Sequence, residues 1–149
     1  MEVRELTRKP PVSAPVQATV ADVARLMDDK VVGAVVVVDG ERPVGIVTDR
    51  DLVVRAVARG LPPDARIDDI MTTDLVVLDA TAPPAEAVRL FEHHSVRRIP
   101  LVEGDQLVGV LSVDDLLVNA VSELSAVIRP ITGQVIFGHA EPHASLAET

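Results

Sequence analysis

The sequence predicts a mixed α/β (α+β) fold built from two copies of one β-α-β-β-α unit, related by a pseudo-twofold axis. The chain has 149 residues, the size of one ordinary domain. When the sequence is shifted by 64 positions, residues 3–57 align with residues 67–121 without a gap, and 15 of the 55 aligned pairs are identical. Hydrophobic residues make up 48% of the chain but aromatic residues only 1%, so the core must consist of Val, Ala, Leu and Ile. This composition favours buried β-branched strands packed against helices with small side chains.

The first copy carries a local signal for most of its elements. Thr19 and Asp22 resemble a capping box at the start of a helix with apolar residues at helical spacing. Gly40 marks the turn between two apolar segments, and Gly60 stands where a helix would end. The expected elements are a lead-in strand at 11–13, a helix at 20–30, strands at 34–38 and 44–48, and a helix at 51–59.

The second copy repeats this order after a linker at Gly60–Asp64, whose two prolines a helix interior cannot accommodate. The expected elements are a lead-in strand at 75–77, a helix at 83–91, strands at 99–102 and 108–112, and a helix at 115–124. The predicted boundaries are therefore 1–60 for the first repeat, 61–124 for the second and 125–149 for a C-terminal extension.

The C-terminal extension has no counterpart in the repeat and is expected to be partly ordered or frayed. Val127–Ile131 and Gln134–Phe137 flank Thr132 and Gly133, which predicts a small hairpin. The last dozen residues have the composition of a frayed end.

Charge and residue usage exclude several classes of function. The formal charge is −9, from 14 basic and 23 acidic side chains, which disfavours general binding to nucleic acid or to an anionic membrane. Cysteine is absent, so disulfide scaffolds, thiolate catalysis and cysteine-bound zinc are excluded. The N-terminus has no apolar signal core, and the longest apolar run, Ala34–Val38, is far shorter than a membrane span. We expect a soluble cytoplasmic protein.

The two junctions between a strand and the following helix place a hydroxyl and a carboxylate three residues apart. These pairs are Thr48 with Asp51 and Ser112 with Asp115. A helix start offers free N–H groups to an anion, and a carboxylate can accept hydrogen bonds from ribose hydroxyls. The structural alternative is that each pair only caps its helix, and duplication would copy a cap as readily as a binding site.

Arg97 and Arg98 are adjacent cations at the start of the predicted strand 99–102. Because arginine presents a bidentate fork, this position is suited to a phosphate group. The alternative is a solvated segment whose guanidinium groups pair with surface carboxylates. The first copy has Gly33 and Ala34 at these positions, so the two potential sites are not equivalent.

Neither a metal centre nor a catalytic centre is predicted. His139 and His143 are four residues apart, but Gly138 and Pro142 disfavour the helix that would hold both rings on one face. The sequence contains no nucleophile elbow, Walker loop or dinucleotide fingerprint. We therefore expect a protein that is not an enzyme.

Together, these motifs resemble a tandem pair of CBS domains of the stand-alone bacterial type, also called a Bateman module. The resemblance covers residues 3–124 and rests on four segments, each in its expected order: Gly-Ile-Val-Thr-Asp-Arg-Asp at 45–51, Asp-Ile-Met-Thr at 69–72, Val-Arg-Arg-Ile-Pro-Leu-Val at 96–102 and Gly-Val-Leu-Ser-Val-Asp-Asp at 109–115. The resemblance implies two repeats packed sheet to sheet, with two clefts that take AMP, ADP, ATP or S-adenosylmethionine as regulatory ligands and no required cofactor.

The resemblance also assigns roles to individual residues. It implies that Asp51 and Asp115 bind ribose, that Thr48 and Ser112 lie near ribose or phosphate, and that Arg98 contacts phosphate. The implied lining of the adenine is the backbone of two strand starts: Gly33, Ala34 and Val35 in the first repeat, and Arg97, Arg98, Ile99 and Pro100 in the second. Two positions depart from the pattern, since Thr7 stands where the second copy has Met71 and Val36 where it has Pro100.

The leading hypothesis is a non-catalytic regulatory module that binds an adenosine-containing ligand and signals to an unknown regulated protein. The alternative is a dimeric protein-interaction module with vestigial clefts. We expect a homodimer in either case, because the helices at 52–57 and 116–121 have more apolar positions than one sheet face can cover. We also expect Arg98 to approach only one cleft, the one with Ser112 and Asp115, and that cleft to bind more tightly.

Overall fold

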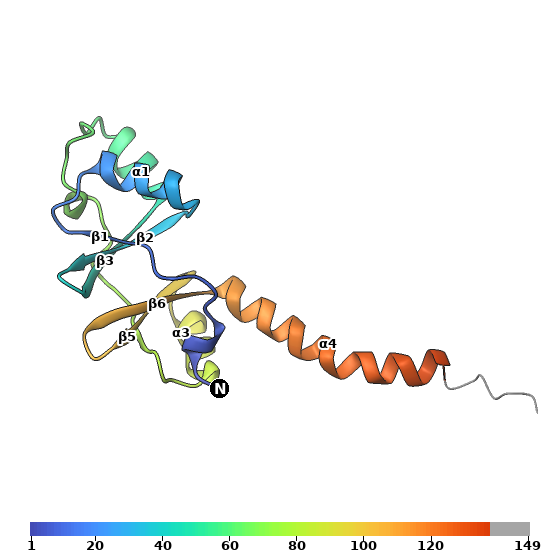
Figure 1. The fold of residues 1–149 in the computed structure, drawn as a ribbon. Helices are drawn as coiled ribbons and strands as arrows, with labels where there is room; N and C mark the ends of the chain where they lie inside the picture. Colours follow the sequence, from blue (N-terminus) through green and yellow to red (C-terminus); the bar gives the residue numbers. More distant parts are fainter. Residues whose placement is uncertain (138–149) are drawn as a thin grey trace, which may run out of the picture.

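The protein consists of two small sheets that meet along one strand from each, with helices on their outer sides (Figure 1). The computed structural model describes residues 1–137, and the side chains of residues 1–131. One long helix, α4, leaves this body and extends away from it (Figure 1). The mixed α+β fold and the two repeats packed sheet to sheet agree with the prediction.

The first repeat forms a three-stranded sheet in the order β1-β2-β3, with β1 parallel and β3 antiparallel to β2. Its elements are β1 (Ser13–Pro15), α1 (Val20–Lys30), β2 (Ala34–Asp39), β3 (Arg42–Thr48), α2 (Asp49–Asp51) and a π-helical segment, η2 (Leu52–Val57), that continues α2. The predicted capping box is confirmed, because the Asp22 amide donates to Thr19 Oγ1 over 3.1 Å and the Thr19 amide donates to Asp22 Oδ2 over 3.0 Å. The turn at Gly40 is confirmed by its φ of +65°.

The second repeat has the same topology, in the order β4-β5-β6. Its elements are β4 (Leu78–Asp79), α3 (Pro84–His93), β5 (Arg98–Glu103), β6 (Gln106–Ser112) and α4 (Val113–Phe137). Strand β4 begins one residue after the end of the lead-in expected at 75–77. Both sheets have a register shift at the same place, after Val37 in β2 and after Leu101 in β5, which confirms that one structural unit is duplicated.

The segments that begin the two repeats, residues 3–9 and 67–73, are exchanged; they precede the strands expected at 11–13 and 75–77 and are called the lead-ins from here on. The first lead-in forms a short 3-10 helix, η1 (Val3–Leu6), and the Val3 amide donates to the carbonyl of Ala82 in the second repeat over 2.9 Å. The second lead-in forms η3 (Ile67–Asp69), and the Ile67 amide donates to the carbonyl of Ala18 in the first repeat over 2.8 Å. Each repeat therefore completes its hydrogen bonding with a segment of the other.

The same exchange builds the two hydrophobic cores. Ile67 and Ile70 are buried in the core of the first repeat, while Val3 and Leu6 are buried in the core of the second. As the composition predicted, both cores consist of aliphatic side chains, with Met27 as the one sulfur-containing exception among the buried residues. Because each core takes side chains from both copies, neither repeat can bury its full apolar face alone.

The hairpin expected within residues 127–137 is wrong. Helix α4 runs without interruption from Val113 to Phe137, through the segments that were assigned to two strands. A capped helix extends by one hydrogen bond per residue, whereas an isolated two-stranded hairpin is marginal in water. The helix tolerates Pro130 at the loss of one backbone hydrogen bond. The frayed end expected for the last dozen residues lies outside the described residues.

No helix within the described residues is long and apolar enough to cross a membrane.

Two equivalent glycines test the exchange of lead-ins. A Cβ atom added at Gly45 would lie 2.3 Å from Met71 Sδ and 2.8 Å from Met71 Cγ, whereas one added at Gly109 would meet Thr7 Oγ1 at 3.6 Å. We therefore expect Gly45→Ala to lower the free energy of unfolding by about 1–3 kcal/mol through overpacking. Gly109→Ala is expected to change it by less than about 0.5 kcal/mol. Urea denaturation of both variants measures this difference.

Met71→Thr provides the control for this pair, since threonine stands at the equivalent position 7. We expect Gly45→Ala to be much less destabilising in the Met71→Thr background than in the wild type. Equal destabilisation in the two backgrounds would show that Met71 does not pack on Gly45.

Candidate functional site

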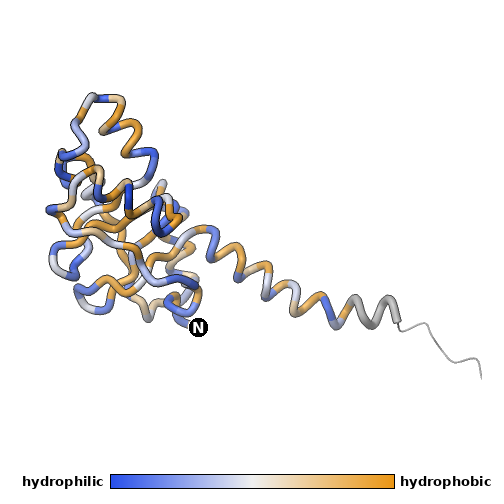
Figure 2. Tube along the Cα trace, turned by 45° about the horizontal axis from the view of Figure 1, so that its top comes forward, coloured by the Kyte–Doolittle hydropathy of each residue, from blue (hydrophilic) through white to orange (hydrophobic). Residues whose placement is uncertain are grey.

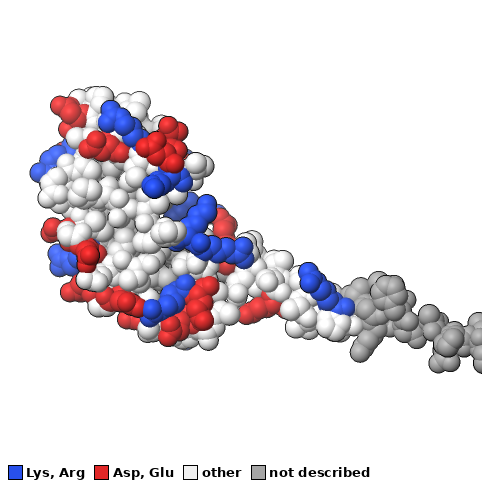
Figure 3. Space-filling model, viewed as in Figure 1, with Lys and Arg blue, Asp and Glu red and all other residues white. Residues whose placement is uncertain are grey.

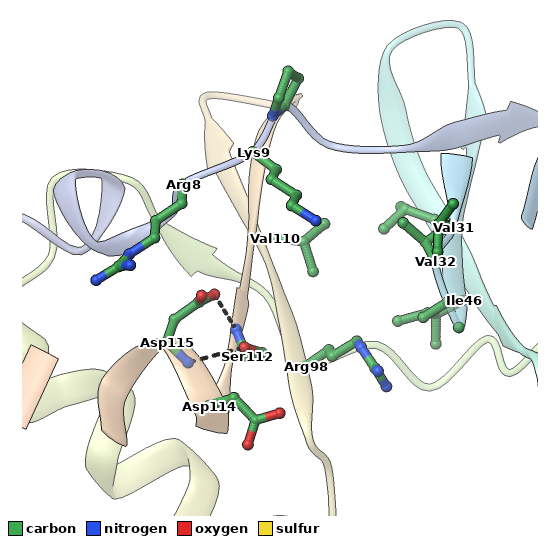
Figure 4. A pocket seen from close by; sticks show the side chains of 14 residues that line it. Arg8, Lys9, Val31, Val32, Ile46, Arg98, Val110, Ser112, Asp114 and Asp115 are labelled. Carbon is green, nitrogen blue, oxygen red and sulfur yellow. Dashed lines mark hydrogen bonds between the residues drawn. The ribbon is translucent and has the colours of Figure 1, made fainter. Parts of the chain in front are cut away.

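Two clefts lie between the repeats, and each is lined by the start of a strand from one repeat and the start of a helix from the other. Cleft 1 has a volume of about 370 Å³ and cleft 2 about 300 Å³, which is at the lower end of the range for small-molecule sites. Cleft 1 is lined by Arg8, Lys9, Pro10, Val31, Val32, Gly33, Ala34, Val36, Ile46, Arg98, Val110, Ser112, Asp114 and Asp115 (Figure 4). Cleft 2 is lined by Ile46, Thr48, Asp51, Thr72, Ser95, Val96, Arg97 and Arg98.

The hydroxyl and carboxylate at each helix start form a reciprocal cap. The Ser112 amide donates to Asp115 Oδ2 over 3.0 Å, and the Asp115 amide donates to Ser112 Oγ over 3.0 Å (Figure 4). In the first repeat the equivalent distances are 2.9 Å from the Thr48 amide to Asp51 Oδ2 and 3.2 Å from the Asp51 amide to Thr48 Oγ1. Both pairs therefore cap their helices, which was the structural alternative to a binding role. Each cap uses only the Oδ2 atom of the aspartate and leaves Oδ1 for other partners.

The two aspartates differ in what lies beside this second oxygen. Arg55 Nε lies 3.7 Å from Asp51 Oδ1, and the same guanidinium donates to the carbonyl of Ile70 over 3.0 Å. In the second repeat Asn119 stands at the position of Arg55. Among the described side chains, no cation lies within ion-pair distance of Asp115. Asp115 Oδ1 is therefore available to a ligand in cleft 1, whereas Asp51 Oδ1 is already paired in cleft 2.

Arg98 lines both clefts, so the expectation that it approaches only one of them is wrong. In the β5–β6 register Arg98 is directly opposite Ser112, which places it beside cleft 1. Its Nη2 atom lies 3.8 Å from the position that a Cβ on Gly33 would occupy, and Asp49 Oδ2 lies 3.3 Å from the same position. The long Arg98 side chain thus spans the boundary between the two clefts. Arg98 therefore cannot account for a difference in ligand binding between cleft 1 and cleft 2.

The remaining predicted residues divide into cleft-lining and core positions. Gly33 and Ala34 line cleft 1, and Arg97 lines cleft 2. The side chains of Val35, Ile99 and Pro100 are fully buried and line neither cleft. Any contact of these three residues with a ligand must come from their backbone.

Nine of the 14 residues that line cleft 1 were not predicted, among them Arg8, Lys9 and Val31. Arg8 and Lys9 belong to the first lead-in, and the exchange carries them to the helix start of the second repeat. The adjacent cations are visible in the sequence, but the exchange that positions them is not. Val31 ends α1 in the left-handed conformation, with φ 55° and ψ 52°, and is 85% exposed.

The conformation of Val31 is unfavourable for a β-branched residue, and its exposed apolar side chain gains little from packing. Backbone strain of this kind concentrates at functional sites. Val31 is the C-cap of α1, and its amide donates to the carbonyls of Met27 and Asp28 that the end of the helix leaves free.

Within the part of the chain that the structure describes, no group of three or more His, Cys, Asp and Glu side chains is placed to hold a metal ion. His139 and His143, which were weighed as a ligand pair, lie outside the described residues.

Comparison with known proteins identifies the repeat. The profile of the CBS domain family matches this chain twice, at residues 3–57 and 67–122. These ranges agree to within one residue with the two copies, 3–57 and 67–121, found by aligning the sequence with itself.

Relatives of known sequence or structure agree with this match. The CBS domain-containing protein YhcV of Bacillus subtilis is 35% identical over 108 residues, which cover 72% of this chain and 77% of YhcV. The structure of CBS domain protein PAE2072 from Pyrobaculum aerophilum, complexed with AMP, is 34% identical with a TM-score of 0.71, covering 78% of this chain and 90% of that one. A hexameric CBS-CP12 protein from bloom-forming cyanobacteria is 32% identical with a TM-score of 0.69, covering 78% and 66% of the two chains.

The cap at cleft 1 can be measured separately from any binding role. We expect Ser112→Ala to lower the free energy of unfolding by about 1 kcal/mol, because the Asp115 amide loses its acceptor. Ser122→Ala, in the exposed middle of the same helix, is expected to be neutral or slightly stabilising, since alanine is the better helix former. Urea denaturation of the two variants decides the point: equal midpoints would mean that the Ser112 hydroxyl is not a cap.

Proposed function

Since this chain belongs to the CBS domain family, as a pair of CBS domains that form a regulatory module, we propose that it binds an adenosine-containing ligand in cleft 1. The ligand class is AMP, ADP, ATP or S-adenosylmethionine. The observation that carries this proposal is the available Oδ1 atom of Asp115 beside an apolar wall and three cations.

The chemistry of cleft 1 suits the three parts of an adenine nucleotide. One wall is apolar and fits the face of a purine base; it consists of Val31, Val32, Ala34, Val36, Ile46 and Val110. Asp115 can accept hydrogen bonds from vicinal ribose hydroxyls without breaking its cap, because the cap uses only Oδ2. Arg98 can donate two charge-assisted hydrogen bonds to a phosphate. The AMP-bound relative from Pyrobaculum aerophilum supports the same ligand class.

We propose that cleft 1 binds more tightly than cleft 2. Both clefts include Arg98, so the difference must come from other residues. In cleft 2 a ribose would have to compete with Arg55 for the Asp51 carboxylate, whereas in cleft 1 the equivalent position is the neutral Asn119. Competition with an existing ion pair reduces the net gain from a new hydrogen bond.

Each cleft is lined by residues of both repeats, so a bound ligand can change how the two repeats are placed relative to each other. A ligand in cleft 1 contacts β2 of the first repeat and the start of α4 in the second, so it stabilises one relative placement of the two. A regulated protein can respond only if it distinguishes the two placements, because coupling requires differential affinity. The proposal includes no catalytic step and assigns the module to the cytoplasm.

A second candidate function is protein interaction through a homodimer, with clefts that bind no ligand. The observation that favours it is a set of exposed apolar side chains on equivalent helices: Val53, Val54 and Val57 in η2, and Leu117, Val118 and Val121 in α4.

The apolar stripe of α4 continues beyond the repeat. Leu117, Val121, Leu124, Ile128 and Ile131 are spaced alternately by four and three residues and are each 46–60% exposed. Figure 2 shows hydrophobic positions recurring along the coloured part of the projecting helix. A stripe with this spacing packs against a second helix, and another copy of α4 carries the matching surface. The hexameric CBS-CP12 relative, which assembles from several copies, supports this proposal.

Titration calorimetry with AMP tests the leading proposal. We expect Asp115→Asn to weaken the strongest binding by about ten- to a hundredfold, because one charged acceptor is lost. Asp51→Asn is the matched control and is expected to change that affinity by less than about twofold, although it removes the same charge from the equivalent position. Loss of the strongest binding in Asp51→Asn alone would assign it to cleft 2. Absence of nucleotide binding at millimolar concentration would favour the second candidate.

Light scattering tests the homodimer. At about 50 µM we expect a dimeric mass for the wild type, since a standard interface would be saturated. Val121→Asp is expected to give a monomer, because it places a charge in the apolar stripe. Ser122→Asp adds the same charge beside the stripe and should remain dimeric. A monomeric wild type would contradict the proposal.

A further inference from the structure

We propose that Arg8 and Lys9 select adenine nucleotides with two or more phosphates at cleft 1, so that ADP or ATP, and neither AMP nor S-adenosylmethionine, is the ligand. This inference rests on the proposed function and specifies its ligand. It is carried by the unpaired cations that surround cleft 1.

Cleft 1 has three cations that the fold itself does not use. Arg8, Lys9 and Arg98 line it, and none has a carboxylate within 4 Å among the described residues. Ion pairs are not general in the described chain: Arg4, Arg25, Arg55 and Arg66 have a carboxylate within 4 Å, and the other ten Lys and Arg side chains do not. What distinguishes Arg8, Lys9 and Arg98 is that all three line the same cleft.

The three cations line cleft 1 at separate points. Figure 4 shows the Lys9 ammonium extending into the cleft toward Val110, the Arg8 guanidinium directed outward beyond Asp115, and the Arg98 guanidinium directed away from Ser112 toward Ile46. A group of Lys and Arg side chains is also visible on the body next to the base of α4 (Figure 3). The N-terminal end of this 25-residue helix adds a positive dipole at the same place.

A single phosphate does not need all three cations. It carries a charge of about −1.5 to −2, which Arg98 and the start of α4 already meet. Each additional phosphate brings further charge and more acceptor oxygens, and Arg8 and Lys9 are the groups left to meet them. S-adenosylmethionine has no phosphate and bears a sulfonium cation, so the same three side chains disfavour it.

Cleft 2 has two cations in its lining, Arg97 and Arg98, against three in cleft 1. Thr72 and Thr73 stand at the repeat positions of Arg8 and Lys9, and Thr72 lines cleft 2. We therefore expect the selection by phosphate number to be stronger at cleft 1, because the exchanged lead-in brings Arg8 and Lys9 there.

The test is titration calorimetry of the full chain with AMP, ADP, ATP and tripolyphosphate, in EDTA, at low and high salt. We expect ATP to bind about tenfold more tightly than AMP at low salt, with a ratio that falls at high salt because exposed charges are screened. The double variant Arg8→Gln/Lys9→Gln should lose most of this ratio, because ATP loses more affinity than AMP when both cations are removed. Arg42→Gln, an exposed cation that lines neither cleft, is the control and should keep the full ratio.

The outcomes separate this inference from the function on which it rests. Equal affinity for AMP and ATP in the wild type would overturn the inference and leave the adenosine site intact. A preference for ATP that survives in the double variant would overturn the role of Arg8 and Lys9. Tripolyphosphate binding as tightly as ATP would overturn the requirement for adenosine, and absence of binding by every nucleotide would overturn the proposed function itself.

Discussion

The clefts of this protein depend on the exchange of two short lead-in segments. Val3 and Ile67 are both fully buried, each in the core of the opposite repeat, and their amides make the same hydrogen bond to the opposite repeat. Burial of these aliphatic side chains holds the repeats together, because neither core is complete without the other lead-in. The exchange also passes the first lead-in over the helix start of the second repeat. The chemistry of cleft 1 is thus a consequence of how the cores are completed.

Duplication gives the two clefts one geometry, and single substitutions give them different chemistry. The reciprocal caps at Ser112 and Thr48 are nearly identical in length, so the helix starts are equivalent as backbone. The two aspartates differ in the neighbour of the oxygen that the cap does not use. Arg55 pairs with Oδ1 of Asp51, whereas the neutral Asn119 stands at the equivalent position beside Asp115. Two clefts built on the same helix start can therefore differ in the carboxylate oxygen that they leave free. Functional difference then requires no change in fold.

The sequence predicted the repeated unit well, because its signals are local. The capping residues and the turn glycines act within a few positions, and the structure confirms them. The errors arise where distant segments decide. Thr132 and Gly133 favour a turn locally, but α4 continues through them once its capped start has nucleated it. Arg8 and Lys9 are far in sequence from Ser112, and Arg98 reaches two clefts because of its length. No periodicity in the sequence encodes either contact.

The most direct test of this account is a crystal structure of the chain grown with saturating ADP. We predict density for the nucleotide in cleft 1, with its ribose on Asp115 Oδ1, its base against the apolar wall and its terminal phosphate beside Lys9. The Asp51–Arg55 pair should remain intact in the same crystal. Density in cleft 2 alone, with the Arg55 guanidinium displaced from Asp51, would contradict the account.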